Sequence, residues 1–181
     1  MNTISVSGKS WILKKFNQEE ISYFKDNHSL DEITSKLLSI RKIKKEDVNS
    51  FLNPLIKNFL PNPNNLVDME KTTSRTIKAI NEKEKIGIFG DYDVDGATST
   101  ALLGKYFTEL KLTYEIYIPD RKKEGYGPSI KSFKELIQKG VKIIFTVDCG
   151  TLSFDAIDFA KKNEVDVIVL DHHQSEINLP N

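Results

Sequence analysis

The sequence has one cysteine, no long apolar run and no net charge. A single cysteine, Cys149, excludes a disulfide within the chain and fits a reducing cytoplasm. The apolar runs fall short of the roughly 18 residues that cross a bilayer, and the N-terminus lacks a secretion signal, so we expect a cytoplasmic protein without membrane segments. Lysine plus arginine number 26, as do aspartate plus glutamate. This balance argues against a dedicated, strongly basic nucleic-acid-binding domain but is compatible with a local basic groove.

The chain divides by pattern into two regions. Residues 1–84 are polar and rich in lysine and asparagine, with helical spacing interrupted by prolines. From residue 85 onward, short apolar runs alternate regularly with helical patterns. We therefore expect a small helical region over 1–84 and a separate domain over 85–181.

Four runs rich in apolar residues in the second region predict short strands, over 86–89, 114–118, 141–147 and 165–170, and the first of them is expected to be buried. Helical patterns lie between them, over 97–110, 132–139 and 154–162. Strands and helices that alternate at these lengths imply right-handed crossovers and parallel pairing. The predicted fold class is α/β, a mostly parallel sheet flanked by helices and preceded by a small helical region.

Acidic and histidine residues follow three of the four predicted strands. In chain order they are Asp91, Asp93, Asp95, Asp148, Asp171, His172 and His173. In an open parallel sheet, ligands bind outside the carboxyl ends of the strands. We therefore expect these side chains to meet at one edge of the sheet.

Several carboxylates at one edge repel one another unless a cation compensates their charge. Oxygen ligands with one or two imidazoles suit a divalent ion, with Mn²⁺ preferred and Mg²⁺ second, whereas a lone cysteine argues against zinc. Asp93 and Asp95 are two residues apart, so on an extended turn both can point the same way, one towards each of two ions. The sequence therefore predicts a two-ion site suited to phosphoryl chemistry.

Taken singly, these residues have simpler explanations. An Asp-x-Asp segment is common in loops, Asp148 could cap the following helix, and His172 with His173 could form a surface turn. Cys149 is best explained as a small buried residue beside a ligand. Only their joint occurrence at three strand ends favours a metal site.

Two further segments could contact phosphate. Thr98 and Ser99 follow Gly96 at the start of a predicted helix, where free N–H groups attract anions, although ordinary capping explains them equally well. The loop 119–127 follows the second strand to the same edge and carries Arg121, which could clamp a phosphate bidentately.

These clusters resemble the motifs of the DHH phosphoesterase superfamily, whose name is the triplet at 171–173. Residues 91–96 resemble its first motif and residues 147–150 its second. The loop 119–127 and the N-terminal region narrow the resemblance to the RecJ-type exonucleases, which are specific for single-stranded DNA. The resemblance covers essentially the whole chain.

The resemblance implies a set of metal ligands. Asp93 and Asp148 would serve one ion, while Asp95, Asp148 and His172 would serve the other, so that Asp148 bridges the two. Related phosphatases place a histidine where this chain has Phe89. The first ion would then depend on water or Asp91 for its remaining ligands.

The resemblance also implies roles around the metals. His173 would contact the scissile phosphate and stabilise its developing charge. Asp91 would support the metal site, and Asp171 would orient His172 or the turn.

The expected activity is Mn²⁺-dependent 5′-to-3′ exonuclease action on single-stranded DNA, in recombination and repair. Single-strand-binding protein and a recombination helicase would be partners by resemblance. The alternatives are a DHH phosphodiesterase for oligonucleotides or cyclic dinucleotides, and a non-catalytic RecJ-like scaffold. The family has a further metal-binding aspartate and a second domain beyond the triplet, so we expect a truncated chain that alone turns over little.

Overall fold

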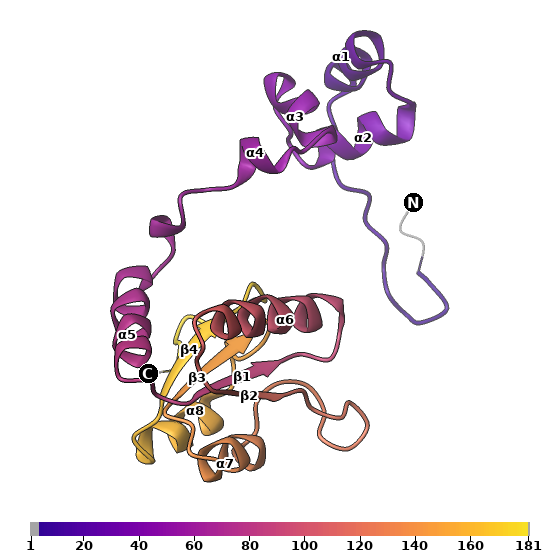
Figure 1. Ribbon diagram of the computed structural model, residues 1–181. Coiled ribbons are helices and arrows are strands. Elements are labelled where there is room, and N and C mark those ends of the chain that lie inside the picture. The colour runs from indigo at the N-terminus through magenta and orange to yellow at the C-terminus, as the bar shows by residue number, and fades with distance from the viewer. Residues whose placement is uncertain (1–3, 181) are drawn as a thin grey trace. The chain divides into compact units, whose positions relative to one another are not determined.

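The computed structural model describes residues 4–180. The chain divides into two compact units at the bond between Asn62 and Pro63 (Figure 1). None of the helices that these residues form has both the length and the apolar character needed to cross a membrane.

The first unit is a small helical cluster. Its helices are α1 (Gln18–His28), α2 (Glu32–Ile40), η1 (Lys45–Asp47), α3 (Val48–Leu52) and α4 (Ile56–Phe59). Phe24, Leu38 and Val48 form its buried core. Asp31 caps α2 by accepting hydrogen bonds from two backbone N–H groups, which fixes where that helix begins.

The second unit starts with η2 (Pro63–Asn65) and α5 (Met69–Asn81). The side chain of Arg75 on α5 pairs with Glu84 and with Asp166, and Ala79 is fully buried against the sheet. The second compact unit includes α5, which lies within the predicted region 1–84 and packs against the sheet through Ala79.

The sheet has four parallel strands. They are β1 (Ile86–Gly90), β2 (Tyr114–Tyr117), β3 (Ile143–Val147) and β4 (Asp166–Leu170), in the spatial order β2-β1-β3-β4. The residues of β1 and β3 are buried throughout, as expected for strands covered on both faces. The predicted α/β class with a parallel sheet is confirmed.

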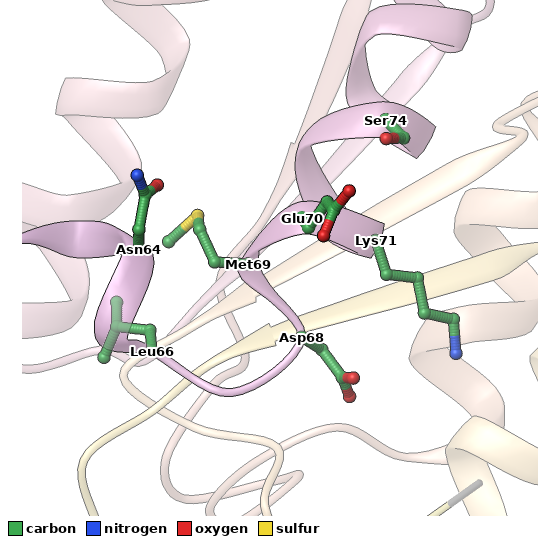
Figure 2. A pocket seen from close by; sticks show the side chains of 7 residues that line it. All are labelled: Asn64, Leu66, Asp68, Met69, Glu70, Lys71 and Ser74. Atoms are coloured by element: carbon green, nitrogen blue, oxygen red, sulfur yellow. The ribbon is translucent and has the colours of Figure 1, made fainter.

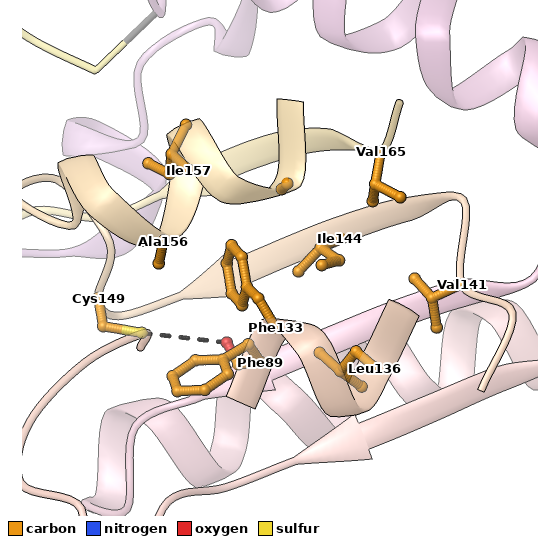
Figure 3. Packing of buried hydrophobic residues seen from close by; sticks show 10 residues of the cluster. Phe89, Phe133, Leu136, Val141, Ile144, Cys149, Ala156, Ile157 and Val165 are labelled. Carbon is orange, nitrogen blue, oxygen red and sulfur yellow. Dashed lines mark hydrogen bonds between the residues drawn. The ribbon is translucent and has the colours of Figure 1, made fainter. Parts of the chain in front are cut away.

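Helices cover both faces of this sheet. Figure 1 shows α6 (Val94–Glu109) on one face and α7 (Ile130–Gln138) with α8 (Phe154–Lys162) on the other. Alternate residues of β1 supply the two cores: Ile88 packs with α6, and Phe89 packs with α7 and α8 (Figure 3).

Several element boundaries differ from the predicted ones, among them the starts of α6 and β3. Helix α6 begins at Val94, three residues early, because the Asp93 carboxylate caps it by accepting a hydrogen bond from Gly96 N at 3.0 Å. Strand β3 begins at Ile143, two residues late. The first difference places Asp95 and Gly96 in the first helical turn.

Candidate metal centre

Three strand ends meet at the carboxyl edge of the sheet. Asp91 follows β1, Asp148 follows β3 and Asp171 follows β4, and these three strands are neighbours. Backbone hydrogen bonds extend the ladder past the strands, from Asp91 N to Val147 O at 3.3 Å and from Asp148 N to Leu170 O at 2.9 Å. The backbone therefore holds the first residue after each strand beside its neighbour.

Three of the carboxylates form a compact cluster. Asp91, Asp93 and Asp148 each offer an oxygen atom within 4.8 Å of those of the other two. Asp91 is 3% exposed and Asp148 5%. The Oδ1 atom of Asp91 is buried and has no hydrogen-bond partner among residues 4–180. A buried oxygen without a partner is costly unless something outside the chain contacts it.

The carboxylates of Asp93 and Asp148 disfavour each other's ionised form. Burial raises the pKa of Asp148, and the neighbouring Asp93 raises it further. The Gly96 N–H group lowers the pKa of Asp93. Both carboxylates therefore resist ionising together without a compensating positive charge.

The histidines join this cluster from the end of β4. His172 Nε2 lies 3.0 Å from Asp148 Oδ1, and Asp148, His172 and His173 form a second group with ligand atoms within 4.8 Å of one another. The two imidazole rings lie with their centroids 4.7 Å apart. Asp148 thus belongs to both groups.

Asp171, which we expected to orient His172 or the turn, contacts His173 within the turn. Its Oδ1 atom accepts hydrogen bonds from His173 N at 3.1 Å and from His173 Nδ1 at 2.7 Å. Its Oδ2 atom accepts from Thr151 N at 3.1 Å and from Thr151 Oγ1 at 2.6 Å. Burial alone would raise the pKa of Asp171, but these hydrogen bonds outweigh it and hold the pKa well below its usual value. Asp171 therefore fixes the turn and the ring of His173.

Tyr126 is a site residue that sequence reasoning missed as an individual residue. Its hydroxyl lies 3.1 Å from the carbonyl oxygen of Asp148 and 3.1 Å from His173 Nδ1. Its only sequence signal was the Gly-Tyr-Gly run of the loop 119–127. Thr151 was missed as well, because nothing in its local sequence indicates contact with a residue 20 positions away.

Asp95, Thr98 and Ser99 lie on the first two turns of α6. Asp95 is exposed and belongs to neither ligand group found within residues 4–180. The Thr98 hydroxyl donates to the Val94 carbonyl oxygen at 2.8 Å. Because α6 starts at Val94, Thr98 and Ser99 lie beyond the free N–H groups of its first turn. Any phosphate contact by these two residues would come from their side chains.

Arg121 is held near the first motif. Its guanidinium lies over the ring of Tyr92, 5.3 Å from the ring centroid. The loop that carries it is anchored by Glu124, which accepts a hydrogen bond from the Tyr117 hydroxyl at 2.5 Å and from Asp120 N at 2.9 Å. The exposed guanidinium therefore lies on a loop with fixed contacts.

Phe89 and Cys149 contribute to packing. Phe89 is fully buried and stacks on Tyr117 at a centroid distance of 5.5 Å. The Cys149 thiol is buried in the same core, 4.0 Å from the Phe89 carbonyl oxygen (Figure 3), and burial raises its pKa. A protonated, buried thiol is a poor nucleophile, which agrees with the packing role expected from the sequence.

Two surface hollows lie in the second unit. One, of about 540 Å³, lies at the start of α5 and is lined by residues of the segment 64–74, such as Asp68 and Lys71 (Figure 2). It contains none of the predicted site residues. The other, of about 720 Å³, lies between Tyr126 and the starts of α7 and α8. Tyr126 connects this second hollow to the cluster around His173.

The residues at the sheet edge fit a divalent cation. They supply carboxylate oxygens and imidazole nitrogens, the donors that Mn²⁺ accepts. The unpartnered Asp91 oxygen and the repulsion between Asp93 and Asp148 are both relieved by a positive ion. The fold and this cluster together define an α/β domain with a candidate metal centre at its carboxyl edge.

Residues 85–181 match the family model described as "DHH family, N-terminal domain". The chain therefore belongs to the DHH family. It is 33% identical over 171 residues to the single-stranded-DNA-specific exonuclease RecJ of Bacillus subtilis, covering 94% of this chain and 22% of that protein. It is 40% identical over 130 residues to RecJ of Haemophilus influenzae, covering 71% of this chain and 22% of that protein.

Comparison with solved structures agrees with this family assignment. A crystal structure of exonuclease RecJ bound to manganese aligns with a TM-score of 0.57 at 32% identity, covering 61% of this chain and 29% of that one. RecJ from Thermus thermophilus in complex with Mn²⁺ aligns with a TM-score of 0.60 over 93% of this chain and 23% of that one. At 21% identity, the second match supports the fold alone. The chain spans about a fifth of the length of the curated relatives it matches.

Proposed function

We propose that this chain forms part of a metal-dependent phosphodiesterase that degrades single-stranded DNA from the 5′ end, in recombination and repair. One observation carries the proposal: the cluster of Asp91, Asp93 and Asp148, in which Asp91 and Asp148 are buried and one Asp91 oxygen has no partner, meets His172 at the sheet edge. The relatives named single-stranded-DNA-specific exonucleases support the substrate, and the manganese-bound RecJ structure supports the metal.

The ligands divide between two Mn²⁺ ions, with Mg²⁺ as the second choice. Asp93 and Asp148 would hold one ion, and Asp95, Asp148 and His172 the other. Asp91 would support the first ion through its buried Oδ1 atom. Bound divalent ions would supply charge compensation at the phosphate and activation of water. Asp95 would need to turn its exposed carboxylate towards the cluster.

The remaining residues act on the substrate. His173 would contact the scissile phosphate and stabilise its developing charge. Arg121 would bind a phosphate with its planar guanidinium, steadied by Tyr92. The side chains of Thr98 and Ser99 would contact the DNA backbone from α6. A cytoplasmic location and partnership with single-strand-binding protein and a recombination helicase belong to this proposal.

We further propose that residues 1–84 form a RecJ-like helical region and residues 85–181 part of the DHH phosphoesterase domain. The alternatives within the family are a phosphodiesterase for oligonucleotides or cyclic dinucleotides and a non-catalytic scaffold. The presence of the first region and of the Arg121 loop favours the exonuclease. Because the relatives are far longer, metal binding is a better first test than turnover.

The test is calorimetric titration of the 181-residue chain with Mn²⁺. We expect saturable binding that Asp148→Ala abolishes and that Asp158→Ala, which removes an exposed carboxylate of α8, leaves unchanged. Equal binding by wild type and Asp148→Ala would overturn the site. Absence of Mn²⁺ binding in the wild type would favour the scaffold.

Substrate class is tested next, with Mn²⁺ present and excess enzyme. A 5′-labelled single-stranded oligonucleotide and a cyclic dinucleotide are supplied separately, and products are followed over time. We expect mononucleotide release from the DNA at the higher rate. Faster cleavage of the cyclic dinucleotide would reverse the order of the two enzymatic functions.

A further inference from the structure

The imidazole of His173 has one nitrogen enclosed by oxygen atoms. Its Nδ1 atom lies 2.7 Å from Asp171 Oδ1 and 3.1 Å from the Tyr126 hydroxyl oxygen. The ring of Tyr126 also meets the His173 ring edge to face, with centroids 5.7 Å apart. The position of the proton on His173 therefore depends on what these two oxygens can donate or accept.

The Tyr126 hydroxyl has one hydrogen and two neighbours. The carbonyl oxygen of Asp148, at 3.1 Å, can only accept, so the hydroxyl hydrogen points there. The hydroxyl lone pair is then left to accept from His173 Nδ1. Asp171 is also an acceptor, because each of its two oxygen atoms already accepts a hydrogen bond from a backbone N–H group. With two acceptors facing Nδ1, that nitrogen must carry the hydrogen.

Asp171 cannot turn away from this arrangement. Its side chain is 2% exposed, and both of its oxygen atoms are occupied. Thr151 holds Oδ2 with its backbone N–H and its hydroxyl, while the His173 backbone N–H holds Oδ1. Thr151 thus fixes the carboxylate that in turn fixes the ring.

We infer that Tyr126 and Thr151 are positioning residues that hold the neutral His173 ring as its Nδ1–H tautomer, so that Nε2 is the nitrogen that can take up a proton and donate a hydrogen bond to the scissile phosphate. The hydrogen bond made by one imidazole nitrogen sets what the other nitrogen can do. The tautomer and its supports follow from the contacts alone. The phosphate contact rests on the proposed function.

The test of the tautomer is ¹⁵N NMR of the metal-free 181-residue chain, labelled at histidine, at a pH where the imidazoles are neutral. The variant His173→Gln assigns the signals, because the chain has three histidines. We expect Nδ1 of His173 to carry the hydrogen and Nε2 to be bare. A wild-type ring protonated at Nε2, or divided between the two forms, would overturn the inference.

Three variants test the supports. Thr151→Val removes the hydroxyl with little change in shape, Thr151→Ser keeps it, and Tyr126→Phe removes one acceptor. We expect Thr151→Val and Tyr126→Phe each to give a mixture of tautomers and Thr151→Ser to match the wild type. Tyr114→Phe is the control, because its hydroxyl bonds Thr108 elsewhere in the domain. If Thr151→Val and Tyr126→Phe both keep the wild-type tautomer, the two residues are not positioning residues.

Function is measured separately on the same variants. Because neither residue offers a ligand atom to the clusters, Mn²⁺ affinity should stay within about twofold of the wild type. Mn²⁺-dependent cleavage of single-stranded DNA should fall about 10-fold to 100-fold in kcat for Thr151→Val with KM unchanged, and Thr151→Ser should restore it. Failure of the wild type to bind Mn²⁺ would reject the proposed function, but it would leave the inference about the His173 tautomer unaffected. If Thr151→Val has a mixture of tautomers but an unchanged kcat, the contact of Nε2 with the phosphate is rejected, while the positioning of the ring by Thr151 stands.

Discussion

Asp148 Oδ1 lies 3.0 Å from His172 Nε2, although the two residues follow different strands. Their contact arises because β3 and β4 are neighbours in register, so that the residues after them meet at the carboxyl edge. Asp148 has a φ of 62°, a left-handed conformation that aspartate tolerates better than most residues. This turn ends β3 and places the carboxylate between His172 and the acidic residues after β1.

Replacing Asp148 by asparagine should separate stability from metal binding. Without metal, Asp148→Asn removes the repulsion from Asp93 while keeping an oxygen for His172. The apo chain should therefore gain on the order of 1 kcal/mol of unfolding free energy. With Mn²⁺ at 100 times its Kd, the wild type should gain about 2.7 kcal/mol and the variant almost nothing.

Thermal unfolding with and without Mn²⁺ measures both effects. Asp158→Asn serves as the control and should behave like the wild type in each condition, since its side chain is exposed on α8. A variant that loses stability in the absence of metal would show that Asp148 is not under repulsion.

Gly96 is required by a close approach of two backbone segments. A Cβ atom built there would lie 2.4 Å from the carbonyl oxygen of Asp91. Alanine favours a helix over glycine by about 1 kcal/mol, yet Gly96→Ala should destabilise the domain by about 1–3 kcal/mol because the clash is with backbone. Gly104→Ala, also in α6, meets only the end of the Tyr114 side chain at 3.3 Å and should change stability by less than about 1 kcal/mol. Equal effects in urea unfolding would contradict this account.

The order of the elements could be predicted because the strands are rich in apolar residues, most of all the fully buried β1 and β3, as a parallel sheet covered on both faces requires. The convergence of the acidic and histidine segments was expected from the same fold. The start of α6 was missed, since its cap is Asp93, a residue that we had assigned to metal alone. One aspartate can be both a helix cap and a candidate ligand.

The contacts of Tyr126, Thr151 and Asp171 could not be predicted from the sequence, for a different reason. Each depends on how loops from separate strands pack, and the distance of 47 positions between Tyr126 and His173 carries no local signal. Likewise, nothing in the triplet at 171–173 indicates which histidine the aspartate contacts. Only the packed loops decide that it is His173.

The hydrogen bond from Tyr117 to Glu124 should make stability depend on pH. The Tyr117 hydroxyl, followed by Asp120 N–H, lowers the pKa of Glu124 below its ordinary value of 4.5. A lowered folded-state pKa adds stability above the unfolded-state pKa, and that stability is lost as the pH falls through the folded-state pKa.

Tyr117→Phe should therefore cost about 1 kcal/mol near neutral pH. The cost should shrink as the pH falls below the ordinary Glu124 value of 4.5. Urea unfolding of wild type and variant across the acid range gives the difference at each pH. Tyr114→Phe loses a hydroxyl contact with Thr108 instead, and its cost should stay constant over the same range. If the loss of unfolding free energy in Tyr117→Phe does not vary with pH, the stabilisation does not depend on the ionisation of Glu124.

Arg121 should bind DNA through the shape of its side chain as well as its charge. Arg121→Lys keeps the charge but loses the planar fork and its stacking on Tyr92. We expect about 10-fold weaker binding of a 5′-phosphorylated single strand, measured by fluorescence anisotropy at fixed salt. Lys122→Ala removes a whole charge from the neighbouring exposed residue and should weaken binding less than Arg121→Lys does. Tyr92→Leu should fall between the two, because it removes only the ring beneath the guanidinium. If Lys122→Ala has the larger effect, the loop binds DNA through its positive charge, and the guanidinium of Arg121 makes no specific contribution.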